Sequence, residues 1–224
     1  MEDIEVMIEG AEEDEEGLTN DVYFQDDKVI QIFSKYPLTS FFTSLTSMFS
    51  SPEYYSRSKR ISNEVEAAER LSDCEFKPPQ VLDYNDEVVV FERVKGKSGF
   101  DWVQAADEEE VRELANRFQC FFEQIHGMNV ALRDARLSNF LISKDEVYSI
   151  DHEYIELNAN SLIKTIDELT LISSVIQTRK YSIFIDEFDC RPTIRFLSFF
   201  TSIGHAILLE RSMKRTKNVL RSLR

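Results

Sequence analysis

Residues 132–139 read LRDARLSN, and residues 149–153 read SIDHE. Together these stretches supply the carboxylates of Asp134 and Asp151 and the carboxamide of Asn139. Mg²⁺ prefers such oxygen ligands, and it usually takes one or two carboxylates together with the phosphates of a substrate. Arg136 lies within the first stretch and is expected to face phosphate. The two stretches therefore predict a site that binds Mg²⁺ and phosphate.

The segments before this pair of stretches read mainly as strands. Residues 21–24 and 28–33 are short apolar stretches separated by a polar turn, and residues 81–84 and 88–91 repeat the pattern around an acidic turn. Each pair is typical of a hairpin of antiparallel strands. Between the hairpins, residues 58–71 place apolar side chains on one face, which predicts an amphipathic helix.

From Asp107 onward the pattern is mainly helical. Acidic residues open a run whose apolar side chains recur at helical spacing as far as Gly127. Two short strands are expected at residues 140–142 and 147–150, and the chain after Leu162 again reads as helix.

This order of elements predicts an α+β fold of two lobes. Residues 1–94 are expected to form a small antiparallel sheet lobe with one helix. Residues 95–224 are expected to form a mainly helical lobe that carries the loop of Asp134.

Composition limits the classes of function. The 224 residues include 26 Lys and Arg against 41 Asp and Glu, which gives a formal net charge of −15. That charge repels nucleic-acid phosphates and anionic lipid headgroups, which argues against a general nucleic-acid binder. No apolar run reaches the roughly 20 residues of a membrane helix, and the acidic N-terminus lacks the basic region of a signal peptide. With three separated cysteines, which fit free thiols in a reducing compartment, these features predict a cytoplasmic protein without a membrane span.

The charges are distributed unevenly along the chain. Residues 1–27 carry 12 acidic residues and no Lys or Arg, and they include an acidic run at residues 12–16. Residues 209–224 carry six Lys and Arg and one acid, among apolar residues typical of a helix. Two interpretations of this basic segment stay open: a packed terminal helix with a solvated charged face, or a docking surface for an acidic partner.

Residues 132–139 resemble the H-R-D-x-K-x-x-N loop of the protein-kinase-like superfamily, and the resemblance extends over most of the chain. It implies that Asp134 is the catalytic Asp and that Arg136 takes the place of the phosphate-facing Lys. It also implies that Asn139 and Asp151 are the metal ligands, because Asp151 is similar to the Asp of the D-F-G element. The implied cofactors are ATP and Mg²⁺.

Residues 150–154 narrow the resemblance to a small archaeal-type kinase similar to choline and aminoglycoside kinases. They read IDHEY, which is nearer to the I-D-x-E-Y form of those kinases than to D-F-G. The GLTN sequence resembles their G-x-T-N loop, which implies that Gly17, Thr19 and Asn20 lie at the nucleotide.

Three further positions follow from the same resemblance. Residues 91–96 are similar to the hinge of these kinases, where backbone groups near Glu92 and Val94 would meet adenine. His126 falls where the family has a structural His. Asp167 is the candidate for the Asp at a helix start that braces the catalytic loop.

The third strand departs from the family pattern. The family's strand Lys, which holds nucleotide phosphates, should fall within residues 28–33, and the aligned position is Gln31. The helix Glu that pairs with this Lys is present as Glu64. A neutral Gln supplies no positive charge, so phosphate binding there is expected to be weaker. Lys28 has the opposite strand parity, and Lys35 lies four residues beyond Gln31.

Three functions stay open at this point. The first is a small, unregulated, Mg²⁺-dependent kinase that transfers the γ-phosphoryl group of ATP to a hydroxyl of a small molecule, an envelope sugar or a protein. The second, suggested by Gln31 and the acidic run, is a pseudokinase or nucleotide-gated interaction module. The third is a KEOPS-type kinase-like ATPase, whose H-G-D-x-T-x-x-N loop residues 132–139 do not match.

Overall fold

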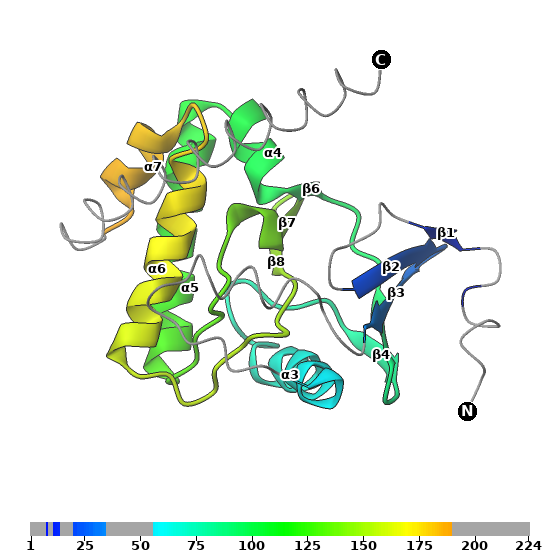
Figure 1. The fold of residues 1–224 in the computed structure, drawn as a ribbon. Helices are drawn as coiled ribbons and strands as arrows, with labels where there is room; N and C mark the ends of the chain where they lie inside the picture. The colour runs from blue at the N-terminus through cyan, green and yellow to red at the C-terminus, as the bar shows by residue number, and fades with distance from the viewer. Residues whose placement is uncertain (1–7, 9–10, 14–19, 35–55, 190–224) are drawn as a thin grey trace, which may run out of the picture. The chain divides into compact units, whose positions relative to one another are not determined.

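The computed structural model describes residue 8 and residues 11–13, 20–34 and 56–189 (Figure 1). It divides into two compact units that alternate along the chain. The first unit comprises Met1–Ser98 and Asn139–Leu157, and the second comprises Gly99–Ser138 and Asn158–Arg224. The segment that carries Asp151 therefore belongs to the same unit as the first strands.

An antiparallel sheet dominates the first unit. Its strand order is β1-β2-β3-β5-β4. The strands are β1 (Glu12–Glu13), β2 (Asn20–Gln25), β3 (Lys28–Phe33), β4 (Val81–Tyr84) and β5 (Val88–Glu92). Both predicted hairpins are confirmed, since β2 pairs with β3 and β4 pairs with β5. In the first turn Asp26 has φ 45°, a left-handed conformation that Asp tolerates better than most residues.

Helix α3 (Arg57–Arg70) covers one face of this sheet. The side chain of Ser56 accepts a hydrogen bond from the N–H of Lys59 and caps the first turn. Ile61 packs in one buried cluster with Phe33, Val89 and Phe91. The predicted amphipathic helix is therefore confirmed, and alternate residues of β3 and β5 face it.

A second, three-stranded sheet completes the first unit. Its strands are β6 (Lys97–Ser98), β7 (Phe140–Ser143) and β8 (Glu146–Ser149), in that order. The predicted strands that follow the loop of Asp134 are thus confirmed. Just before β6, a Cβ atom on Gly96 would lie 2.7 Å from the carbonyl oxygen of Ile142, so a larger residue would force β6 and β7 apart.

The described part of the second unit contains four α-helices: α4 (Gly99–Ala105), α5 (Glu108–Gly127), α6 (Ser161–Val175) and α7 (Tyr181–Glu187). Asp107 and Glu110 form a capping box at the start of α5, where the acidic first turn predicts that a helix begins. Helices α5, α6 and α7 lie side by side (Figure 1). Phe118 of α5 contacts Phe184 of α7, with ring centroids 5.7 Å apart. Helix α4 was not predicted from the sequence.

Some predictions lie outside the described residues. These are Gly17, Thr19, Lys35, residues 14–16 of the acidic run and the basic segment at residues 209–224. Cys74 and Cys120 are free thiols, as predicted. Within the described part of the chain, no helix combines the length and the apolar character needed to cross a bilayer.

Candidate active site

The side chain of Asp167, on α6, anchors the loop that carries Asp134. The Asp167 carboxylate accepts hydrogen bonds from the backbone N–H groups of Leu132 at 2.8 Å and Arg133 at 2.6 Å. Arg133 has φ 66°, so the loop turns sharply just before Asp134. The bracing role of Asp167 is confirmed, but Asp167 lies in the interior of α6 and not at its start.

His126 supports the same anchor. Its Nε2 lies 3.3 Å from Oδ2 of Asp167, and its ring stacks on that of Phe122 with centroids 5.2 Å apart. Burial raises the pKa of Asp167, while the hydrogen bonds from His126 and the loop N–H groups oppose the shift. The predicted structural role of His126 is thereby confirmed.

Asp134 and Arg136 form an ion pair at the surface of the second unit. Nε of Arg136 donates to Oδ1 of Asp134 at 2.6 Å, and Nη2 donates to Oδ2. This fork contacts both carboxylate oxygens and therefore fixes the plane of the carboxylate. The Asp134 side chain is 23% exposed and that of Arg136 is 56% exposed, so solvent reaches the pair. Leu137 secures the loop on its other side, since its N–H donates to Oγ of Ser174 at 3.0 Å.

Asn139 and Asp151 both belong to the first unit. The N–H of Ile150 donates to the carbonyl oxygen of Asn139 at 2.9 Å, which ties the residue before Asp151 to Asn139. Among the described residues, no three His, Cys, Asp or Glu side chains converge to hold a metal. Asn139 and Asp151 offer an amide oxygen and a carboxylate, which fit Mg²⁺ when a nucleotide supplies further oxygen ligands.

The residues around Asp151 are fixed by buried contacts. Asp151 has φ 61°, a conformation that costs about 1 to 3 kcal/mol and persists where the surrounding contacts impose it. The N–H of His152 donates to Oε1 of Glu64 at 2.8 Å, and the His152 ring lies 3.1 Å from Oγ of Ser149. Ser149 in turn donates to the carbonyl oxygen of Phe76 at 3.0 Å. Glu64, predicted as the helix Glu, thus binds the segment of Asp151.

Glu153, which follows His152, forms a buried ion pair with α3. Arg60 of α3 lies 2.9 Å from Oε2 of Glu153, and both side chains are at most 2% exposed. Asn20 accepts from Arg60 at 2.9 Å and donates to Glu153 at 3.2 Å, so its amide belongs to the same network. Asn63 donates to the backbone oxygen of Glu153 at 2.7 Å.

Sequence reasoning missed Arg60, Asn63 and Glu153. One signal for them was present: residues 60, 63 and 64 share one face of a predicted helix, and a buried Arg on such a face requires an acidic partner.

The remaining predicted residues lie on β3, at the end of β5 and just after it. Gln31 lies on the same face of β3 as Val29 and Phe33, the face that packs against α3. Glu92 ends β5 and accepts from the N–H of Gln80 at 3.1 Å, and half-buried Val94 follows outside any strand.

Comparison with known proteins addresses the fold. No protein-family model matches the chain, and no curated protein matches its sequence. Among solved structures, the chain is similar to APH(2″)-IIa in a ternary complex with streptomycin and ATP, with a TM-score of 0.57 and 10% identity. The match covers 88% of this chain and 89% of that chain. The chain has a two-lobe protein-kinase-like fold. The predicted fold class is confirmed, while the chemistry rests on the residues described above.

Proposed function

We propose that the chain is a kinase that transfers the γ-phosphoryl group of ATP to a hydroxyl acceptor. The observation that carries the proposal is the anchored loop: Asp167 fixes the turn that presents Asp134, and Arg136 orients the Asp134 carboxylate. In the proposed reaction Asp134 accepts the proton of the acceptor hydroxyl as its oxygen attacks the γ-phosphorus. The bond to the bridging oxygen breaks, and ADP leaves.

The other residues have supporting roles in this proposal. Asn139 and Asp151 would hold Mg²⁺, which when bound neutralises charge on the phosphates. Arg136 would stabilise the charge on the transferred phosphoryl group while it remains close to Asp134. Backbone groups near Glu92 and Val94 would meet adenine, and the Gly17, Thr19 and Asn20 segment would meet phosphate.

The acceptor is proposed to be a small molecule or an envelope sugar, with a protein as the less favoured choice. Only nine residues, 152–160, separate Asp151 from the start of α6 at Ser161. Part of this segment is pinned, since the N–H of Ile155 donates to the carbonyl oxygen of His152 at 2.9 Å. A segment this short and this constrained offers little backbone for a protein substrate to bind.

Formation of ADP from Mg·ATP tests the proposal, both without an acceptor and with choline or streptomycin added. Asp134→Asn should lower turnover by about 10²- to 10⁴-fold, because it removes the general base. Asp145→Asn is the matched control, since Asp145 is an exposed carboxylate in the turn between β7 and β8. Equal turnover by Asp134→Asn and the wild-type chain would overturn the proposal.

The second candidate is a pseudokinase or nucleotide-gated interaction module. Neutral Gln31 favours it, as does Glu64, whose carboxylate is bound by His152. The same experiment separates the two functions. A pseudokinase that binds nucleotide gains thermal stability from Mg·ATP but forms no ADP above the level of Asp134→Asn.

A further inference from the structure

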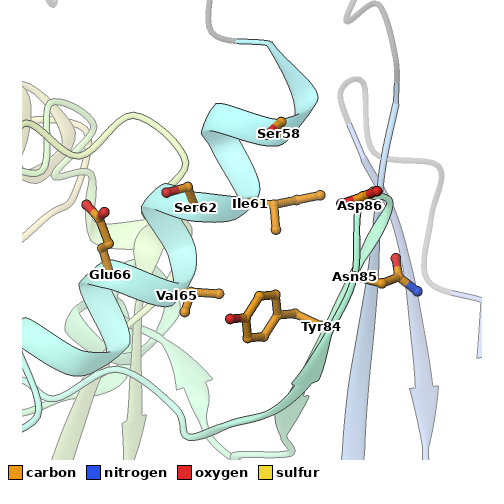
Figure 2. Close-up of a pocket in the computed structure, with 8 residues that line it drawn as sticks. All are labelled: Ser58, Ile61, Ser62, Val65, Glu66, Tyr84, Asn85 and Asp86. Atoms are coloured by element: carbon orange, nitrogen blue, oxygen red, sulfur yellow. The ribbon is translucent and has the colours of Figure 1, made fainter. Parts of the chain in front are cut away.

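A groove lies on the side of α3 that faces the β4–β5 turn. It encloses about 500 Å³ and is lined by Ile61 and Val65 from the helix and Tyr84 from β4, with Glu66 and Asp86 among its polar residues. Ile61, Val65 and Tyr84 point toward one another across the groove (Figure 2). The groove belongs to the first unit alone and involves none of the residues assigned to nucleotide or metal.

The walls of the groove are braced before any ligand arrives. The Asn85 side-chain oxygen accepts from the N–H groups of Glu87 at 2.8 Å and Val88 at 3.0 Å, which fixes the turn between β4 and β5. Arg57, in the first turn of α3, pairs with Glu87 at 2.6 Å and joins the helix to this turn. A preformed site binds with less loss of conformational entropy than one that must be ordered.

Two large apolar side chains of β4 are exposed to solvent. Tyr84 is 57% exposed and Leu82 is 44% exposed, and together they are two of the five large hydrophobic residues exposed among those described. β4 is also an edge strand of the described five-stranded sheet. Of these two residues only Tyr84 lines the groove, and an exposed aromatic side chain at a groove is typical of surfaces that bind a protein partner.

Charge indicates the chemistry of that partner. The groove is lined by two acids, and none of the described residues that line it is Lys or Arg. Asp83 adds an acidic group on the same hairpin, whereas Arg57 and Glu87 are paired with each other, so their charges cancel. A basic group would therefore find complementary charge here, and an acidic one would be repelled.

We propose that this groove binds a basic, amphipathic segment of a partner protein. An apolar side chain of the partner packs between Ile61, Val65 and Tyr84, and its Lys or Arg residues pair with Glu66 and Asp86. Because more than half of Tyr84 is exposed, the shape suits a segment laid across the surface better than an enclosed small molecule.

Because α3 forms one wall of the groove, a bound segment would also contact the helix that holds the segment of Asp151. The opposite face of the helix carries Arg60, Asn63 and Glu64, which hold the segment of Asp151. A ligand on the outer face thus contacts the element that positions the proposed metal ligand. This consequence rests on the proposed function, whereas the binding itself does not.

Fluorescence anisotropy of a dye-labelled synthetic peptide of alternating lysine and leucine tests the proposal. The full chain should bind this peptide, and Tyr84→Ala should weaken binding by about tenfold, as loss of an interface anchor does. Combining Glu66→Gln with Asp86→Asn should weaken binding and reduce its salt dependence. Glu69→Gln, an exposed acid on α3 outside the groove, should leave binding unchanged.

Three results would overturn the proposal. The first is the absence of peptide binding by the full chain. The second is equal binding of a peptide in which serine replaces leucine, because the apolar lining would then have no part in recognition. The third is equal weakening by Glu69→Gln and the groove variants, because the peptide would then respond only to the overall negative charge. Since nucleotide is absent throughout, none of these results depends on whether the chain is a kinase.

Discussion

At the scale of single residues, the pairing of Asp134 with Arg136 is the feature closest to the proposed chemistry. The kinase motif that residues 132–139 resemble has lysine where this chain has Arg136. Arginine presents a planar fork, which here contacts both oxygens of the carboxylate. Arg136 can therefore fix the plane of Asp134 and also supply positive charge for a phosphoryl group.

The two roles of Arg136 can be separated by substitution. Arg136→Gln removes the charge and should lower the turnover of ATP by about 10²- to 10³-fold, the range for loss of one transition-state donor. Arg136→Lys retains the positive charge but lacks the planar fork. Its turnover of ATP should lie between that of Arg136→Gln and that of the wild-type chain. Steady-state rates of ADP formation measure both effects. Turnover by Arg136→Gln at the wild-type rate would contradict a role for Arg136 in catalysis.

Gln31 sets a second expectation for a single residue. Gln31→Lys introduces a positive charge on the face of β3 that packs against α3, which carries Glu64. Nucleotide affinity should tighten by roughly 1 to 3 kcal/mol if the ammonium group reaches phosphate. Titration calorimetry with Mg·ATP measures the change, and Lys28→Gln at the exposed end of β3 is the control. Weaker binding by Gln31→Lys would contradict the alignment of this strand with that of the family.

Asp167 predicts how stability depends on pH. Because burial raises its pKa, its contribution to stability is full below its unfolded pKa, about 3.9, and is lost as the pH rises through the folded pKa. Asp167→Asn does not titrate at this position. The free energy of unfolding of the wild-type chain minus that of Asp167→Asn should therefore fall from acid toward neutral pH. Urea unfolding of both proteins measures this difference. A difference that rises with pH would contradict a raised pKa for Asp167.

At the scale of elements, helix α3 carries two ion pairs of contrasting environment. Arg60 and Glu153 are buried, whereas the side chains of Arg57 and Glu87 are 26% and 44% exposed. Removing one partner of a buried pair leaves an uncompensated charge away from water, while an exposed pair loses little because water replaces the partner. The ring of Phe33, 5.4 Å from the Arg60 guanidinium, adds a contact that only the buried Arg makes.

Two substitutions on this helix should therefore differ in their effect. Arg60→Met should lower the free energy of unfolding by about 3 to 5 kcal/mol, because it leaves Glu153 buried without its cation. Arg57→Met should lower it by less than about 1 kcal/mol. Urea unfolding monitored by circular dichroism compares them, with Arg57→Met as the matched control. Similar losses for the two variants would show that the Arg60–Glu153 pair does not hold α3 to the segment of Asp151.

Local sequence predicted the elements better than it predicted their contacts. The hairpins and α5 were predictable because turn residues, strand alternation and helical spacing act over a few neighbouring residues. The short helix α4 carries no such period. The network of Asn20, Arg60 and Glu153 joins residues 40 to 133 positions apart, so it depends on how distant elements meet. The positive φ of Asp151 likewise follows from contacts of His152 and Glu153 with α3.

At the scale of the whole molecule, the residues assigned roles in the proposed function are divided between the two units along the chain. Asp134 and Arg136 belong to the second unit, and Asn139 and Asp151 belong to the first. The two units alternate along the chain, so neither can be cut out as one continuous segment. Binding of Mg·ATP to the folded chain should stabilise it against unfolding.

The expected stabilisation can be stated as a shift in melting temperature. Mg·ATP at 100 times its Kd adds about 2.7 kcal/mol, and about 1 kcal/mol shifts the Tm of a chain of this size by about 2 to 4 °C. We therefore expect Mg·ATP to raise the Tm by about 5 to 10 °C. Asp151→Asn should remove most of this rise while the fold persists, because Asn also tolerates a φ near 61°. Differential scanning fluorimetry with and without EDTA measures the shift, with Asp145→Asn as the control. If the rise survives both EDTA and Asp151→Asn, nucleotide binds without the proposed metal ligand, and the assignment of Asp151 is wrong.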